Sequence, residues 1–222
     1  MNISANPELA PNFIPTMCPR PTKTHIRSIY AGVDQLRIPI DTQGWNSTAP
    51  IFERLIVQTA AEVIVEIGSW KGASAIHMAS VCKKHGLTPL IFCVDFWQDP
   101  ILHTAESMIP QRWDAGFSAY HQFLRNVLAA GHDDCIIPIR TWSPHGAPLL
   151  KAWGVQADLI YVDGGHTYND CLSDIRLYEP LLRHGGVMFG DDWCMDEVKH
   201  AVTTFSPVVE IHEPHWQYPP KA

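Results

Sequence analysis

Two acidic residues, each at the end of an apolar stretch, have the chemistry to bind a nucleotide-like ligand. Glu66 stands in an apolar run just before Gly68 and Gly72, and Asp95 ends a second apolar run. The glycines let the backbone approach a ligand closely, and the helix predicted after Gly72 offers free N–H groups at its N-terminus. In a β-α-β unit, the acid after the second strand is placed to accept hydrogen bonds from ribose hydroxyls. The pattern predicts a cradle for an adenosyl ligand, with an ordinary βα turn as the alternative.

A second set of acids follows two later apolar runs. Asp163 comes after the first of these runs, and Asp191 and Asp192 come after the second. Three carboxylates at one edge would repel one another unless a cation lay between them, and hard oxygen ligands favour Mg²⁺ or another divalent cation. The alternative is that these aspartates cap the helices that follow them. His166, just after Asp163, suits a general base near neutral pH, and its alternative is an ordinary surface histidine.

Four of the eight tryptophans also follow predicted strands, where a flat ring can stack on a base or line a substrate slot. These four are Trp70, Trp97, Trp142 and Trp193. We expect two of them to touch a ligand. The sequence instead predicts that Trp113 and Trp153 belong to the core.

The elements that must position these residues alternate along the chain. Strands are predicted at 62–67, 90–95, 135–139, 157–163, 187–190 and 208–211, with a short antiparallel partner near 216–218. Helices are predicted at 49–60, 72–84, 112–130, 146–153, 168–182 and 196–205, the fifth being stopped by Gly185 and Gly186. This alternation predicts an α/β fold: a Rossmann-like, doubly wound, mostly parallel seven-stranded sheet with helices on both faces. Ligands bind such sheets beyond the carboxyl ends of the strands.

Length and composition favour one domain that binds a small molecule. The chain has 222 residues, of which 46% are apolar, and a formal charge of −7 that argues against nucleic acid as a partner. Residues 1–45 are expected to form an N-terminal arm or lid with little regular structure before Ala49, and residues 46–222 to form the domain. No signal segment and no apolar run of roughly 20 residues is present, so no membrane association is expected. The six cysteines lack C-x-x-C spacing, which fits free thiols and a cytoplasmic location.

Three stretches carry a specific resemblance to a known family. They are V-E-I-G-S-W-K-G-A-S-A from Val65, V-D-F-W from Val94, and I-Y-V-D-G-G-H-x-Y from Ile160 followed by G-G-V-M-F-G-D-D-W from Gly185. Over about residues 45–212 the chain resembles the class I S-adenosylmethionine-dependent methyltransferases. Within that class it looks most like the metal-dependent O-methyltransferases of the catechol type and their relatives that act on antibiotic sugars, including macrolides.

The resemblance implies a set of cofactor-binding residues, namely Glu66, Gly68, Ser69, Gly72, Asp95, Phe96, Trp142, Ser143 and Asp163. It implies S-adenosyl-L-methionine as cofactor and Asp163, Asp191 and Asp192 as ligands of Mg²⁺ or another divalent cation. His166 stands where the catechol-type enzymes have their lysine base, and Asp192 where they have asparagine. Both differences point to the sugar-modifying branch. The implied reaction is methyl transfer to a hydroxyl of a small molecule, a sugar or another natural product. Apart from the resemblance, the sequence leaves both a monomer and a homo-oligomer open.

Other functions are tested against the same residues. An NAD-dependent dehydrogenase would require G-x-G-x-x-G after the first strand, and the spacing here is G-x-x-x-G. A non-catalytic adenosyl-binding protein would lack His166 or the acidic cluster, and both are present. A metal-dependent hydrolase would leave Glu66 and Asp95 without a role. The sequence does not identify the methyl acceptor. Selectivity for the acceptor is expected to lie in the N-terminal arm and in an insertion at 96–108, and neither segment carries a recognisable motif.

Overall fold

The computed structural model describes residues 21–97 and 118–222. Its strands are β1 (Val63–Ile67), β2 (Leu90–Asp95), β3 (Ile136–Arg140), β4 (Ala157–Val162), β5 (Leu182–Gly190), β6 (Glu210–His212) and β7 (His215–Gln217). They form one seven-stranded sheet in the order β3-β2-β1-β4-β5-β7-β6. Strands β1 to β5 run parallel, and β7 is antiparallel to both β5 and β6. The predicted fold class is confirmed.

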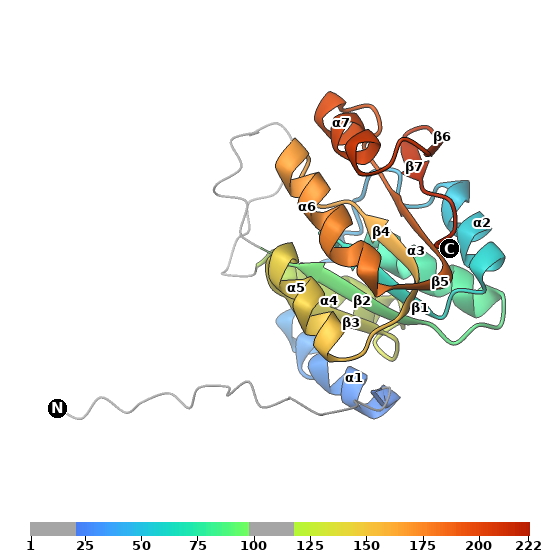
Figure 1. Cartoon of the computed structure of the whole chain (residues 1–222). Helices are drawn as coiled ribbons and strands as arrows, with labels where there is room; N and C mark the ends of the chain where they lie inside the picture. Colours follow the sequence, from blue (N-terminus) through green and yellow to red (C-terminus); the bar gives the residue numbers. More distant parts are fainter. Residues whose placement is uncertain (1–20, 98–117) are drawn as a thin grey trace.

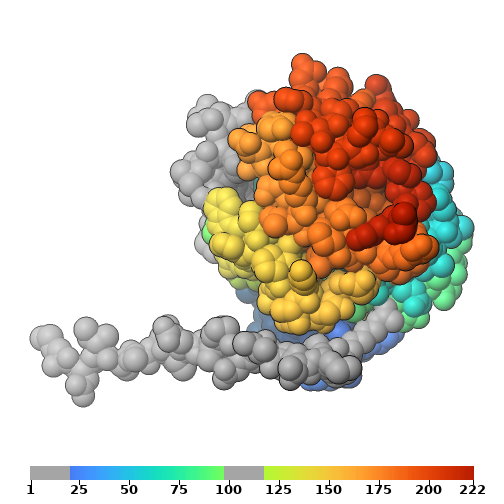
Figure 2. Space-filling model, in the orientation of Figure 1, coloured from blue at the N-terminus to red at the C-terminus, as the bar shows by residue number. Residues whose placement is uncertain are grey.

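Helices cover both faces of this sheet. They are α1 (Lys23–Ile29), α2 (Pro50–Thr59), α3 (Ala73–Lys84), α4 (Ala119–Ala129), α5 (Ser143–Ala152), α6 (Tyr168–Tyr178) and α7 (Asp196–Phe205), with 3₁₀ turns η1 (Val33–Leu36) and η3 (Glu179–Leu181). Helices α5, α6 and α7 lie on one face, and α2 and α3 on the other (Figure 1). Figure 2 shows the side chains of α5 to α7 closing over the near face. No helix in the described part of the chain is long and apolar enough to cross a bilayer.

The central strands are mostly apolar because helices cover both of their faces. Ile64 and Val65 of β1 and Leu159 of β4 are completely buried. Phe52 of α2 packs edge-on against Tyr161, with ring centroids 5.0 Å apart. Since these strands cannot shift without exposing such side chains, their carboxyl ends are held at fixed positions at one edge of the sheet.

Regular structure begins earlier than the sequence predicts. Little is expected before Ala49, yet α1 and η1 lie there, so that prediction is wrong for residues 21–48; residues 1–20 lie outside the described part. Ile26 of α1 and Tyr30, which follows the helix, are buried in the core, and the Tyr30 hydroxyl donates a hydrogen bond to the Ile136 carbonyl of β3 at 2.8 Å. Tertiary contacts thus stabilise a helix too short to show a periodic pattern.

The segment around the paired glycines is a strand and not a helix stop. The helix predicted at 168–182 ends at Tyr178, because Pro180 cannot continue it, and β5 begins at Leu182. Gly185 has a φ of 77°, and the pairing of β4 with β5 changes register beside it. The glycines therefore allow an irregularity inside the strand.

Two predicted helices have different beginnings in the structure. The helix predicted at 146–153 begins three residues earlier, at Ser143, since Pro144 occupies the first turn, where a missing N–H costs nothing. The helix predicted at 112–130 is described only from Ala119, and residues 112–117 lie outside the described part of the chain. Most of the predicted insertion at 96–108 lies outside it too.

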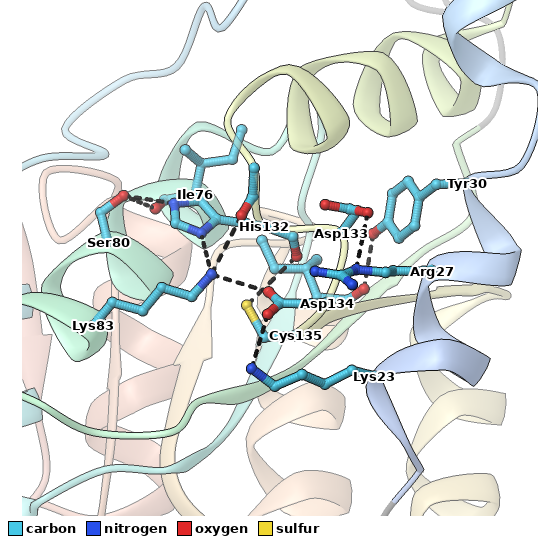
Figure 3. A network of polar contacts seen from close by, with 12 residues as sticks. Lys23, Arg27, Tyr30, Ile76, Ser80, Lys83, His132, Asp133, Asp134 and Cys135 are labelled. Carbon is cyan, nitrogen blue, oxygen red and sulfur yellow. Dashed lines mark hydrogen bonds and ion pairs between the residues drawn. The ribbon is translucent and has the colours of Figure 1, made fainter.

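A charged network fixes α1 to the rest of the domain (Figure 3). Lys23 of α1 and Lys83 of α3 both donate to the Asp134 carboxylate, at 3.1 and 2.9 Å, and Arg27 pairs with Asp133 at 3.6 Å. Burial alone would raise the pKa of Asp134, but the hydrogen bonds from Lys83 and Lys23 lower that pKa to about 2. The network therefore joins α1, α3 and the turn before β3 by charge.

The same network contains a serine–histidine contact that does not activate a nucleophile. Lys83 Nζ lies 3.1 Å from His132 Nδ1, and an ammonium can only donate, so Nδ1 accepts. The Nε2 of a neutral His132 then carries the proton and donates to Ser80 Oγ at 2.8 Å. A catalytic base would need the opposite polarity, so we interpret this contact as structural.

Candidate functional site

The loop after β1 is clamped between the two neighbouring strands. The Gly68 N–H donates to the Val94 carbonyl of β2 at 2.9 Å, and the Asp163 N–H donates to the Ile67 carbonyl at 2.8 Å. Gly68 has a φ of 83°, and a Cβ there would lie 2.0 Å from the Asp163 carbonyl oxygen. Only glycine fits this position, as the sequence predicts for a turn where backbones approach closely.

Glu66 orders this loop from inside the protein. Its side chain is completely buried and accepts hydrogen bonds from the hydroxyls of Ser69 and Ser74. Burial raises the pKa of the Glu66 carboxyl. The structure places Glu66 beneath the predicted cofactor loop, with Gly72 at the N-terminus of α3.

Asp95 holds the same loop from the side. One carboxylate oxygen accepts from the N–H groups of Ser69 and Trp70 at 3.0 and 2.9 Å, and the other accepts from the Trp97 N–H at 2.6 Å. Burial nevertheless raises the pKa of Asp95. Any hydroxyl that donated to this carboxylate would share it with these backbone amides.

An exposed aromatic pair lies beside Asp95. Phe96 and Trp142 are 41% and 55% exposed, and their ring centroids are 4.9 Å apart. The Thr141 N–H donates to the Asp95 carbonyl at 3.0 Å, which holds the ends of β2 and β3 together. Ser143 follows, with its carbonyl accepting from the Tyr178 hydroxyl at 2.8 Å. The structure thus brings Asp95, Phe96, Trp142 and the start of α5 to one place.

The remaining tryptophans differ in their surroundings. Trp97 is 2% exposed and donates to the Trp70 carbonyl at 2.7 Å, so it belongs to the core beneath the loop. Trp70, Trp153 and Trp193 are partly buried against the core. The indole N–H of Trp70 is buried without a hydrogen-bond partner. Trp113 lies outside the described residues.

Asp163, His166 and Asp192 form a compact polar group after β4 and β5. One ligand atom of each lies within 4.8 Å of the others. His166 Nε2 is 2.8 Å from Asp192 Oδ2, and this hydrogen bond raises the pKa of His166. Burial, together with the carboxylates of Asp191 and Asp192, raises the pKa of Asp163 well above its usual value. Both shifts favour the protonated form, a neutral carboxyl at Asp163 and an imidazolium at His166 beside Asp192.

Asp191 has a different position from its neighbour. Its side chain is buried and accepts from Asn46 Nδ2 at 3.3 and 3.1 Å, one distance to each oxygen. His215 Nε2 lies 3.9 Å from Asp191 Oδ1 and has no hydrogen-bond partner. Asp191 does not belong to the compact group, although it follows the same strand as Asp192.

The alternative that these aspartates cap helices is wrong. Helix α6 is capped by Thr167, whose side chain accepts from the Asp170 N–H. Helix α7 begins after Met195, which makes no side-chain cap. None of the three carboxylates therefore serves as the N-cap of α6 or α7.

Sequence reasoning missed a buried polar connection next to the cofactor loop. Lys71 is 5% exposed and pairs with Asp41, while Asn126 of α4 donates to the Lys71 carbonyl at 2.8 Å. The sequence does contain a signal for Asn126. It is a polar residue on a helix face that Phe123 and Val127 otherwise make apolar, which indicates a buried polar contact. No comparable signal marks Asp41 or Asn46.

Comparisons with known proteins agree with this geometry. The family described as "Methyltransferase domain" matches residues 65–193. An uncharacterized protein of Acanthamoeba polyphaga mimivirus is 23% identical over 129 residues, which make up 58% of this chain and 50% of that protein. The chain thus spans about half the length of this curated relative.

Solved O-methyltransferases share the fold. One from Bacillus cereus, in complex with SAH, has a TM-score of 0.57 and 14% identity, covering 91% of this chain and 92% of that one. TomG from Streptomyces achromogenes, involved in tomaymycin synthesis and solved with SAM, has a TM-score of 0.58 and 14% identity, covering 89% and 90%. A putative caffeoyl-CoA O-methyltransferase from Staphylococcus aureus has a TM-score of 0.56 and 13% identity, covering 86% and 90%. The predicted resemblance to class I methyltransferases is confirmed.

Proposed function

Because the chain belongs to the methyltransferase domain family, we propose that it moves a methyl group from S-adenosylmethionine to a hydroxyl of a small molecule. One observation carries this proposal. Asp95 and the Phe96–Trp142 pair lie at the same edge of the sheet as the group of Asp163, His166 and Asp192. The first half of the edge suits an adenosyl ligand, and the second half suits activation of a hydroxyl.

In the cofactor half, the carboxylate of Asp95 accepts the ribose hydroxyls, and Phe96, Trp142 and Ser143 surround the adenine. The loop from Gly68 to Gly72, which Glu66 orders from below, offers its backbone to the amino-acid part. Support comes from the relatives solved with SAM or SAH and from the closeness of Asp95 to the aromatic pair. Most of the rate enhancement should come from positioning, because two bound reactants react as one molecule.

In the acceptor half, the donor set fits a divalent cation. Two carboxylates and an imidazole gather their ligand atoms within 4.8 Å, and the oxygen donors favour Mg²⁺. Asp163 and Asp192 would hold the ion. The resemblance also implies Asp191 as a ligand, but both of its oxygens accept from Asn46. When bound, such an ion lowers the pKa of a hydroxyl that it touches.

His166 takes the proton from the acceptor hydroxyl. In the structure its Nε2 bonds to Asp192, which favours the protonated imidazole that cannot act as a base. A cation held by Asp192 would compete for this carboxylate, and His166 released from it would be neutral and able to accept a proton. The role of Asp192 would then be to hold the cation, and that of His166 to accept the proton.

The proposed acceptor is a sugar or another natural product with a free hydroxyl. TomG, a structural relative, takes part in tomaymycin synthesis, which supports a natural-product acceptor. The proposed location is the cytoplasm, since Cys82, Cys93, Cys135 and Cys171 are free, buried thiols, as expected in a reducing compartment.

Calorimetric titration with S-adenosylhomocysteine tests the cofactor half directly. Micromolar or tighter binding is expected, and no binding would overturn the function. The acceptor half is tested by assaying methyl transfer from labelled S-adenosylmethionine to a panel of glycosides and phenols, with Mg²⁺ and with excess EDTA. Full activity in EDTA would contradict the metal requirement. A metal-dependent hydrolase would show no S-adenosylhomocysteine binding.

A further inference from the structure

Residues 38–47, named here the strap, run from α4 past the cofactor loop to the end of β5. At the start of the strap, Arg125 donates to the Ile38 carbonyl at 3.2 Å and Gln122 to the Pro39 carbonyl at 2.9 Å. Farther along, the strap passes so close to α3 that a Cβ on Gly44 would lie 2.7 Å from the Ala73 side chain. The strap therefore lies against the carboxyl edge of the sheet.

Asn126 joins the strap to the cofactor loop. Its side chain is 1% exposed; its oxygen accepts from the Asp41 N–H at 3.1 Å, and its nitrogen donates to the Asp41 carbonyl at 2.6 Å. The same nitrogen donates to the Lys71 carbonyl at 2.8 Å. One buried amide thus holds both backbones, and neither can move without leaving polar groups unpaired.

A buried charge strengthens this connection. Lys71 extends from the cofactor loop to the Asp41 carboxylate and to Gln43 Oε1 at 3.0 Å. Its side chain is 6% exposed, and a buried ammonium that loses its partner is strongly unfavourable. The strap must therefore stay in place for Lys71 to stay buried.

The far end of the strap is fastened to Asp191. Asn46 has a φ of 54°, a turn that directs its amide to both oxygens of Asp191 at 3.1 and 3.3 Å. The Asp192 N–H donates to the same carboxylate at 2.8 Å. Asp192 itself has a φ of 60°, so the two neighbouring side chains separate, one to the strap and the other to His166.

We propose that Asn46 is a positioning residue and that Asp191 is its anchor, which fastens the strap across the cofactor loop and leaves the cation to Asp163 and Asp192. The proposal rests on the proposed function for the identity of the ligands. It differs from the ligand set that family resemblance implies, because Asp191 acts here through hydrogen bonds to Asn46. We call the contact between Asn46 and Asp191 the latch. Loss of the latch should weaken cofactor binding and leave cation binding unchanged.

Three variants of the full chain separate the role of Asn46 from that of Asp191. They are N46D, D191N and the double variant N46D/D191N, in which the two side chains are exchanged. N46D sets two carboxylates against each other, so S-adenosylhomocysteine affinity measured by calorimetry should fall about tenfold. The double variant exchanges amide and carboxylate, restores a donor–acceptor pair and should return the affinity to within about threefold of wild type. T42A, an exposed change in the strap, is the matched control and should change nothing.

Mn²⁺ binding, followed by electron paramagnetic resonance without cofactor, gives the second readout. D191N and the double variant should bind Mn²⁺ like wild type, whereas D192N should lose most of its binding. Loss of Mn²⁺ binding in D191N equal to that in D192N would overturn the anchor role. Unchanged S-adenosylhomocysteine affinity in N46D would overturn the latch.

A readout without ligands keeps the latch testable even when the proposed function fails. Amide hydrogen exchange of the strap should be faster in N46D than in wild type or the double variant, while the central strands stay equally protected. Equal strap protection in all variants would overturn the latch. Failure of wild type to bind S-adenosylhomocysteine would instead overturn the proposed function.

Discussion

At the scale of single residues, Asp95 has two tasks, and replacing it separates them. Its carboxylate holds the N–H groups of Ser69 and Trp70 and is proposed to accept ribose hydroxyls. Asp95→Ala should weaken S-adenosylhomocysteine binding in calorimetry by about 1.5–3 kcal/mol for each charged hydrogen bond lost. Asp95→Asn keeps one carbonyl oxygen and should lose less. Equal affinity in wild type and both variants would contradict the assignment.

His166 is the residue on which the proposed proton transfer depends. His166→Gln should keep S-adenosylhomocysteine affinity and lose on the order of 10²–10⁴ in kcat. In wild type kcat/KM should rise with pH as the imidazole loses its proton, since the protonated form that Asp192 stabilises is inactive. Initial-rate pH profiles of both proteins measure this. A loss below about tenfold with an unchanged profile would make His166 a positioning residue.

Asp174 of α6 gives a pH-dependent test of buried charge. It is 2% exposed, one of its oxygens has no hydrogen-bond partner, and burial raises its pKa from 3.8 to about 6. A raised carboxyl pKa means that stability falls as pH rises from about 4 to about 6, and the loss persists above that range. Asp174→Asn should therefore raise the free energy of unfolding at pH 8 by roughly 1–3 kcal/mol, and should change it little at pH 4. Urea titrations at both values measure the difference, and equal effects at both would contradict the assignment.

At the scale of elements, the sequence predicts the parts whose stability is local or strongly patterned. The apolar runs that became β1, β2 and β4 are located to within a residue or two, because buried parallel strands are mostly apolar. Helix α1 is missed, because its seven residues are held by Ile26, Tyr30 and ion pairs to distant residues. The strap is missed for the same reason.

The docking of α1 should depend on Asp134. Asp134→Asn removes the ion pairs to Lys23 and Lys83, so amide exchange of 23–29 should accelerate, with a loss of about 1 kcal/mol because Lys23 is largely exposed. The pKa of Asp134 is lowered to about 2, so its stabilisation is present above the ordinary value of 3.8 and lost as pH falls toward 2. The variant and wild type should therefore converge at low pH. Asp133→Asn is the control with a smaller expected effect, and a larger effect there would contradict the role of Asp134.

At the scale of the whole molecule, the sheet determines which distant residues meet. Parallel strands place every carboxyl end at one edge, so Glu66, Asp95, Asp163 and Asp192 could be predicted as neighbours from their positions after strands. The separation of Asp191 from Asp192 could not be predicted, because it depends on the turn at Asp192 and on Asn46 from the strap. The sequence pattern predicts which residues follow the strands. The direction in which each of their side chains points depends on tertiary contacts.

In the proposed function, cofactor and cation occupy different halves of this edge, so their effects on stability should be separable. S-adenosylhomocysteine at about 100 times its dissociation constant should stabilise the folded chain by about 2.7 kcal/mol, which raises the melting temperature by roughly 5–10 °C for a domain of this size. Excess EDTA should leave this shift intact while it removes methyl transfer, because Asp163 and Asp192 are proposed to hold the cation on the acceptor side. Differential scanning fluorimetry measures the shift, with Asp95→Ala as the control that should reduce it. A shift that disappears in EDTA would mean that the cation also supports the cofactor half, since only a ligand shared by both halves could couple them.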